Sequence, residues 1–158
     1  MLRLSKKADY ALMAMKHLAV RGDRGSRGAR GARGASSARE IAEQYDIPIE
    51  LMAKVLQRLV RRGLLLSHQG THGGYQLARG PAQISVADVI QAIDGPVSVT
   101  ACETHEGQCE QFSKCNVRDP LFRVRDRILA ALDECTIAEL ASDPTPVPVR
   151  AAVLHTHV

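Results

Sequence analysis

The stretch "SSAREIAEQYDIPIELMAKVLQRLVRR", residues 36–62, decides the fold. It predicts a short helix capped by one of the two leading serines, with Glu40 completing a capping box three residues after Ser37. A tight turn follows, because the residue before Pro48 avoids the helical region. A second helix over residues 49–62 has an apolar stripe on one side and basic residues on the other. Two helices joined in this way form the helix-turn-helix pattern.

The next stretch, "GLLLSHQGTHGGYQLAR", predicts a small β-hairpin. Gly63 ends the helix, and a short apolar strand at residues 64–66 is followed by a returning strand at residues 75–78. Gly73 and Gly74 lie in the turn, where they permit the positive φ angles of a tight hairpin. A hairpin directly after a helix-turn-helix is a wing, so the sequence predicts a winged helix-turn-helix.

Before this module, residues 5–20 have the apolar spacing of an amphipathic helix, with Ser5 as its cap and Gly22 as its end. Residues 21–35 then consist of five Arg-Gly-x triplets. This stretch has no apolar face and predicts a flexible, solvated loop. Two interpretations stay open, an expanded surface loop with no specific role or a cationic arm that touches DNA phosphates.

After the wing, Ser85 caps a predicted short helix, and a long helix is predicted over residues 118–135. The long helix has a heptad seam suited to pairing with another helix, either in a second subunit or in its own wing domain. The seam consists of Leu121, Val124, Ile128, Ala131 and Cys135. We expect a mainly α fold with a small β-wing, in which a winged helix-turn-helix is joined to a long dimerisation helix. The expected units are a DNA-binding domain at 1–80, a cysteine loop and dimerisation helix at 81–141, and a disordered tail at 142–158.

Composition supports a nucleic-acid-binding function. Residues 1–80 carry 15 lysines and arginines against 6 acidic residues, a net charge of +9, whereas residues 81–158 carry 6 against 11, a net charge of −5. A basic half beside an acidic half indicates a polyanion-binding module joined to a second unit. No apolar run is long enough for a membrane span, and we expect a cytoplasmic protein. No catalytic triad, carboxylate pair, Walker motif or dinucleotide motif stands out, so we do not expect an enzyme.

The stretch "ACETHEGQCEQFSKC", residues 101–115, holds three of the four cysteines. Cys102, Cys109 and Cys115 have the spacing C-x6-C-x5-C. In a reducing compartment such a cluster indicates metal binding or redox chemistry. Thiolates are the ligands of iron–sulfur clusters. Zinc is an alternative, because His105 could complete a three-cysteine, one-histidine set, although zinc ligands are usually closer in sequence. A metal-free thiol sensor is the third possibility.

Taken in this order along the chain, the sequence motifs resemble those of the Rrf-type family of winged helix-turn-helix regulators, which includes IscR, NsrR and RirA. The resemblance rests on "LRLSKKADYAL", "AREIAEQYDIP", "LQRLVRRGLL", "GTHGGYQLAR", "ISVADVIQAIDG" and the three cysteines before a long helix. It implies a homodimer that binds a palindromic site in double-stranded DNA. Several members carry an iron–sulfur cluster on the three cysteines, and the cluster's state controls DNA binding in response to iron–sulfur status, redox state or nitric oxide.

The resemblance leaves the fourth cluster ligand open. Some members use a histidine three residues after the third cysteine, but that position here is Arg118, which cannot ligate. Others use an aspartate near the N-terminus from the partner subunit, and Asp9 stands at that position. His105, Glu103, Glu106 and Glu110 are weaker candidates, whereas Cys135 looks like a small buried hydrophobe on the seam. Family loops commonly have five residues between the first two cysteines, so this loop has one extra residue. Whether the cluster is 2Fe–2S or 4Fe–4S stays undecided.

We expect the second helix of the pair to read DNA from its N-terminal half, as recognition helices do. The residues expected to face base edges are Glu50, Leu51, Ala53 and Lys54. Those expected at the phosphate backbone are Arg58, Arg61 and Arg62. Family members often have an arginine just before the wing glycine, where this chain has Gln69, so wing contacts would fall to Gln69, His68 or His72. A protein-binding module of the same fold is the alternative, and salt-sensitive binding to duplex DNA would exclude it.

Overall fold

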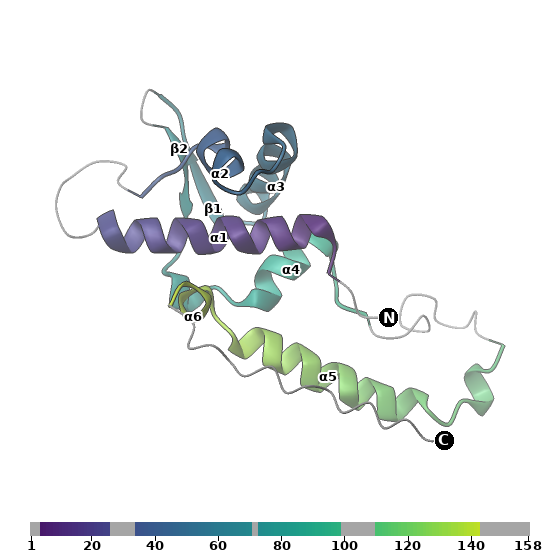
Figure 1. Ribbon diagram of the computed structural model, residues 1–158. Coiled ribbons are helices and arrows are strands. Elements are labelled where there is room, and N and C mark those ends of the chain that lie inside the picture. The colour runs from purple at the N-terminus through teal and green to yellow at the C-terminus, as the bar shows by residue number, and fades with distance from the viewer. Residues whose placement is uncertain (1–3, 26–33, 71–72, 99–109, 143–158) are drawn as a thin grey trace, which may run out of the picture.

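The computed structural model describes residues 4–25, 34–70, 73–98 and 110–142. A long helix, α1 (Lys6–Gly25), crosses the middle of the molecule (Figure 1). On one side lie the helices α2 (Ala38–Gln44) and α3 (Ile49–Arg61) and the strands β1 (Leu65–His68) and β2 (Gly74–Leu77). On the other side lie α4 (Val86–Asp94) and α6 (Ile137–Ala141), and α5 (Arg118–Glu134) extends away from this body. Short 3-10 helices occupy Pro81–Gln83 (η1) and Phe112–Lys114 (η3). The predicted mainly α fold with a small wing is confirmed.

The core is aliphatic and is built around the inner face of α1. Ala8, Ala11, Ala14 and Met15 on that face are fully buried. The small side chains of the three alanines let neighbouring helices approach closely, and α3, α4 and α6 all pack against α1. The predicted apolar stripe of α3 is buried at Met52, Val55, Leu56 and Leu59, while Val60 is half-buried.

The helix-turn-helix forms as predicted, with one additional device. Ser37 and Glu40 make a complete capping box, in which the Ser37 amide donates to the Glu40 carboxylate over 2.7 Å. The helix α2 then ends because Asp46 adopts a left-handed conformation, with φ of 53°. Aspartate tolerates this region better than most residues. The amide of the buried Ile47 reaches back to the carbonyl oxygen of Ala42 over 2.9 Å, which closes the turn.

The wing is a two-stranded antiparallel hairpin that is also fastened to the segment before α2. Leu65 pairs with Leu77, and His68 pairs with Gly74. Ser36 exchanges two backbone hydrogen bonds, of 3.0 and 2.8 Å, with Tyr75 on the other edge of β2. Gly74 permits this approach, because a Cβ atom there would lie 2.8 Å from the backbone of Ser36.

Gly73 is needed for a reason that was not predicted, because a Cβ atom there would collide with the carbonyl oxygen of His68. The strand bounds also differ from the predicted 64–66 and 75–78 by one or two residues, since the register of pairing rather than apolar content sets them.

One helix boundary and one whole helix departed from prediction. The helix α1 continues through Gly22 to Gly25, so the first Arg-Gly-x residues are helical rather than part of a loop. One glycine inside a helix costs only about 1 kcal/mol, which a 20-residue helix tolerates. The helix α6 was not predicted, although Thr136 caps it by accepting from the Glu139 amide. The spacing Thr-x-x-Glu at residues 136–139 was the sequence signal that could have predicted the start of this helix.

The chain after residue 80 joins the same core as the winged module. Ile84, Val89, Ile93 and Ile137 are at most 4% exposed and belong to one apolar cluster with α1 and α3. The capping of α4 by Ser85 is confirmed. The helix α5 packs against α4 and extends away from the wing, and none of its residues is buried. In the described part of the chain, every helix is too short or too polar to cross a bilayer.

We predict that Gly74→Ala destabilises the protein, because the added methyl group would push against the Ser36 backbone. Overpacking of this kind typically costs about 1–3 kcal/mol in the free energy of unfolding. Urea unfolding followed by circular dichroism measures the change.

Gly22→Ala is the matched control, since its Cβ atom would meet nothing within 4 Å and the residue is helical. That change should stabilise the protein by about 0.5–1 kcal/mol. Equal effects of the two substitutions would contradict the close approach at Ser36.

Candidate nucleic-acid interface

The outer face of α3 is set by its buried stripe. With Met52, Val55, Leu56 and Leu59 turned inward, Glu50 and Lys54 are exposed on the solvent side. Leu51 and Ala53 are half-buried at the edges of that face. The four residues expected at base edges therefore share the outward and lateral surface of the first half of α3.

The N-terminus of α3 is open to solvent. Pro48 stands at the N-cap position and has no side chain that could cap the first turn. Ile49 beside it is 41% exposed, although it is a large apolar residue. An uncapped helix N-terminus carries partial positive charge and free N–H donors, which favour an anion such as a phosphate.

A basic hollow of about 220 Å³ lies where α3 meets the start of α1. It is lined by Lys7, Leu51, Lys54, Val55, Gln57, Arg58, Arg61 and Ile93. Four of these residues are cationic and none is acidic. Lys7 was not among the residues predicted to contact DNA. The available signal was the pair of cations, Lys6 and Lys7, at the start of the first helix.

Arg58 differs from the other basic residues of α3. Its Nε donates a 2.9 Å hydrogen bond to the carbonyl oxygen of Ala92 in α4. Part of the guanidinium is therefore used within the protein. Arg61 and Arg62 are exposed at the C-terminal end of α3. In the wing, His68 and Gln69 are exposed, whereas His72 lies outside the described residues.

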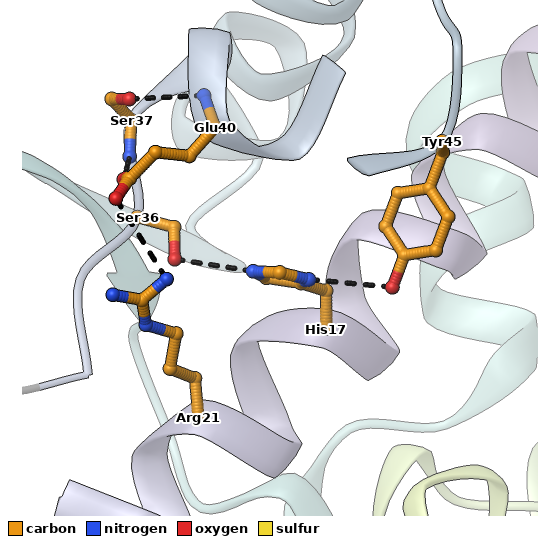
Figure 2. Close-up of polar contacts among 6 residues, drawn as sticks. All are labelled: His17, Arg21, Ser36, Ser37, Glu40 and Tyr45. Carbon is orange, nitrogen blue, oxygen red and sulfur yellow. Dashed lines mark hydrogen bonds and ion pairs between the residues drawn. The ribbon is translucent and has the colours of Figure 1, made fainter. Parts of the chain in front are cut away.

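A polar network joins α1 to the segment that pairs with the wing (Figure 2). The His17 Nδ1 lies 3.3 Å from the Tyr45 hydroxyl, and its Nε2 lies 3.3 Å from the hydroxyl of the fully buried Ser36. Arg21 approaches Glu40 at 3.8 Å. Burial lowers the pKa of His17 below its ordinary value of 6.5, and the positive charge of Arg21 adds to this effect.

An open hollow of about 600 Å³ lies beside this network. His17, Arg21 and Tyr45 line it, and each already bonds to another residue of the protein. We therefore interpret the network as a structural connection between α1, α2 and the wing rather than as a ligand site.

The cysteine site is only partly described. Cys102 and Cys109 lie outside the described residues, together with Glu103, His105 and Glu106. Cys115 is half-buried directly after η3, and Glu110 is exposed before it. Asp9 is half-buried in the first turn of α1. Within the described ranges, no three histidine, cysteine or acidic side chains come together as a metal site.

Cys135 lies at the opposite end of α5 from Cys115. It is the C-cap residue of α5, and its carbonyl oxygen accepts a 2.8 Å hydrogen bond from the Val86 amide at the start of α4. Burial raises the pKa of its thiol, and the nearby Glu139 raises it further.

Comparisons with known proteins agree on one family. A family model described as Rrf2, iron-dependent transcriptional regulator, matches residues 4–143. The HTH-type transcriptional regulator IscR of Escherichia coli O1:K1 is 29% identical over 156 residues, which cover 99% of this chain and 90% of that relative.

Two solved structures extend this agreement to the fold. CymR, the global cysteine regulator of B. subtilis, is 29% identical with a TM-score of 0.69, covering 90% of this chain and 98% of its own. The IscR of T. potens is 27% identical with a TM-score of 0.62, covering 88% and 85%. This likeness supports the winged-helix fold, mostly helical with a small two-stranded antiparallel sheet.

We predict that His17 makes stability depend on pH. Because the pKa of His17 is lower in the folded than in the unfolded protein, its contribution is complete above the unfolded value of 6.5 and is lost as the pH falls through that value toward the folded one. Urea unfolding at several pH values between about 8 and 5 measures the loss.

His17→Gln should show a weaker fall, since glutamine keeps hydrogen-bonding groups but does not titrate. Tyr45→Phe is the control, because it removes one partner and leaves the imidazole in place. A fall of the same size in His17→Gln and in the unmodified protein would exclude His17 as its source.

Proposed function

This chain belongs to the Rrf2 family of transcriptional regulators, and we propose that it reads double-stranded DNA with α3 while the wing and the start of α1 hold the phosphate backbone. The observation that carries the proposal is the basic hollow between α1 and α3, which has four cationic residues and no acidic residue in its lining. It adjoins a recognition helix whose N-terminus has no side-chain cap.

Each part of this surface has a separate role in the proposal. Glu50, Leu51, Ala53 and Lys54 face base edges in the major groove, where side chains can distinguish all four base pairs. Arg61, Arg62 and Lys7 neutralise phosphates, which gives affinity without sequence information. Arg58 contributes the part of its guanidinium that Ala92 does not engage. His68, Gln69 and His72 supply the contacts of the wing.

We propose that the active form is a homodimer on a palindromic operator. The helix α5 supports this, because its seam residues Leu121 and Ile128 are half-buried and Val124 is 44% exposed in the single chain. A second α5 would cover this stripe. Two recognition helices related by two-fold symmetry would then meet two half-sites of one operator. In functional terms, residues 1–80 bind DNA, residues 81–141 sense and dimerise, and residues 142–158 form a tail.

We further propose that the cysteine loop holds an iron–sulfur cluster and that the protein works in the cytoplasm. Cys102, Cys109 and Cys115 supply three thiols, the donor type that iron–sulfur clusters use. Cys135 lies at the opposite end of the 17-residue helix α5 from Cys115, which argues against it as a fourth thiol from the same chain. Asp9 from the partner subunit is our candidate for the fourth position. A bound cluster would supply a centre sensitive to oxidants or nitric oxide, and the residues of this chain would convert its presence into a change in DNA affinity.

A metal-free thiol sensor is the second candidate. It is favoured by the likeness to CymR, the global cysteine regulator of B. subtilis. In that case the same three thiols would respond directly by oxidation, since exposed thiolates are the reactive forms. A zinc site with His105 is the remaining alternative, and it would place a structural metal in the loop.

We predict that protein purified without oxygen contains iron and acid-labile sulfide and absorbs visible light. Replacing Cys102, Cys109 or Cys115 with serine should abolish the absorbance, because the hydroxyl is a poorer ligand for iron than the thiolate. Cys135→Ser is the matched control and should keep it. Stoichiometric zinc without sulfide would favour the zinc site, and neither metal would favour the thiol sensor.

We predict that Lys54→Ala relaxes sequence preference and costs about 1–3 kcal/mol at the specific site, if Lys54 contacts a base edge. Arg61→Ala should weaken all duplexes about equally and reduce the slope of log affinity against log salt by about 1, as expected when one phosphate contact is lost. Binding of both variants to a selected and a scrambled duplex at several salt concentrations measures these effects. A uniform loss in Lys54→Ala would mean that α3 docks in another register.

A further inference from the structure

The C-terminal turn of α4 bonds to both helices that carry the basic hollow. The carbonyl oxygen of Ala92 accepts from Arg58 Nε in α3 over 2.9 Å. Two residues later, the Asp94 carboxylate accepts from the Ser5 amide over 3.1 Å and from the Ser5 hydroxyl over 2.5 Å. Ser5 is the residue whose hydroxyl caps α1 by accepting from the Ala8 amide. Ile93, which lies between the two bonding residues, lines the hollow itself.

The other end of α4 is bonded to the end of α5. The Val86 amide donates to the Cys135 carbonyl oxygen over 2.8 Å, and the Ser85 hydroxyl bonds to the Asp133 carboxylate over 3.2 Å. The Ile137 amide donates to the Ile84 carbonyl oxygen over 2.9 Å. The helix α4 thus has polar connections at both ends, to α5 on one side and to the DNA-binding module on the other.

Between these ends α4 is a well-packed element. Val89, Ile90 and Ile93 are at most 4% exposed, and Ser85 and Asp88 form a complete capping box at the N-terminus. Packed interiors have little free space, so a displaced helix moves its neighbours with it. The chain leaves α4 through Gly95 and Pro96 and reaches the cysteine loop within ten residues.

We propose that α4 is a rigid strut that couples the cysteine loop and α5 to the recognition helix, and that Arg58 is the positioning residue through which the coupling reaches α3. The regulatory part of this inference rests on the proposed function. Displacement of the C-terminal turn of α4 would either carry Arg58 and α3 along or break the bond to Ala92. The Asp94–Ser5 contact would move Lys7 at the same time, so one displacement changes both sides of the basic hollow.

Arg58 and Arg61 provide a matched pair for the test. They lie in the same half of α3, they carry the same charge, and both line the hollow. Of these two residues, only Arg58 has a described hydrogen bond to α4. Methionine at either position removes the charge and keeps an unbranched apolar stem. Any difference between the variants therefore reports on the link to Ala92 rather than on the loss of a cation.

Coupling is reciprocal, so DNA bound to α3 must also stabilise the end of α4. The experiment is amide hydrogen exchange of the full-length protein with and without a saturating duplex, selected by the unmodified protein from a random pool. We expect DNA to slow exchange at residues 92–98 in the unmodified protein and in the Arg61→Met variant, which keeps Arg58. In the Arg58→Met variant, DNA should leave this exchange unchanged. Thermal unfolding checks that both variants fold.

The outcomes separate the two proposals. If Arg58→Met, saturated with DNA, shows the same slowing as Arg61→Met, or if the unmodified protein shows none, the strut is wrong while DNA binding stands. If the unmodified protein binds no duplex in a salt-dependent manner, the proposed function itself fails. Where a cluster is present, the DNA affinities of loaded and cluster-free protein give a second readout. Their ratio should fall toward one in Arg58→Met and stay at the unmodified value in Arg61→Met.

Discussion

The packing of α1 against the helices around it is the constraint on which the structure depends. Alanine at positions 8, 11 and 14 gives α1 a smooth inner face. Large side chains from α3, α4 and α6, such as Leu56, Val89 and Ile137, fill the space against it. Close helix packing has little tolerance for added volume, so this face fixes the distances between the elements. The helix α3 and the end of α4 are near enough to bond because both helices pack on α1.

The elements that could be predicted are those with strong local signals. The capping boxes at Ser37 and Ser85 fixed the starts of two helices, and a 3.6-residue apolar period fixed the inner face of α3. The glycine-rich turn located the hairpin. These signals involve residues within four positions of each other, so a single sequence contains them in full.

What could not be predicted depends on residues far apart in the chain. The bond between Arg58 and Ala92 joins positions 34 residues apart, and the pairing of Ser36 with Tyr75 depends on how α2 sits against the wing. Arg58 in particular looks like any other cation on a basic helix face until α4 is in place. Lys7 was overlooked because the Lys6-Lys7 pair shows that α1 begins with two cations but not that this start lies beside α3. The cysteine ligands stay predictions, since Cys102 and Cys109 lie outside the described residues.

Both ends of the Arg-Gly-x stretch, residues 21–35, are held by the fold, which bears on how the stretch can change in length. The first residues of the stretch, Arg21 to Gly25, belong to α1, and directly after the stretch Ser36 pairs with β2. Gly34 already lies close to Gly22, since a Cβ atom on Gly34 would be 3.1 Å from the Gly22 Cα. When the two ends of an insertion are held together by the fold, doubling its length adds only about 0.6 kcal/mol of loop-closure entropy. The number of Arg-Gly-x triplets can therefore rise or fall during evolution with little effect on the stability of the folded domain.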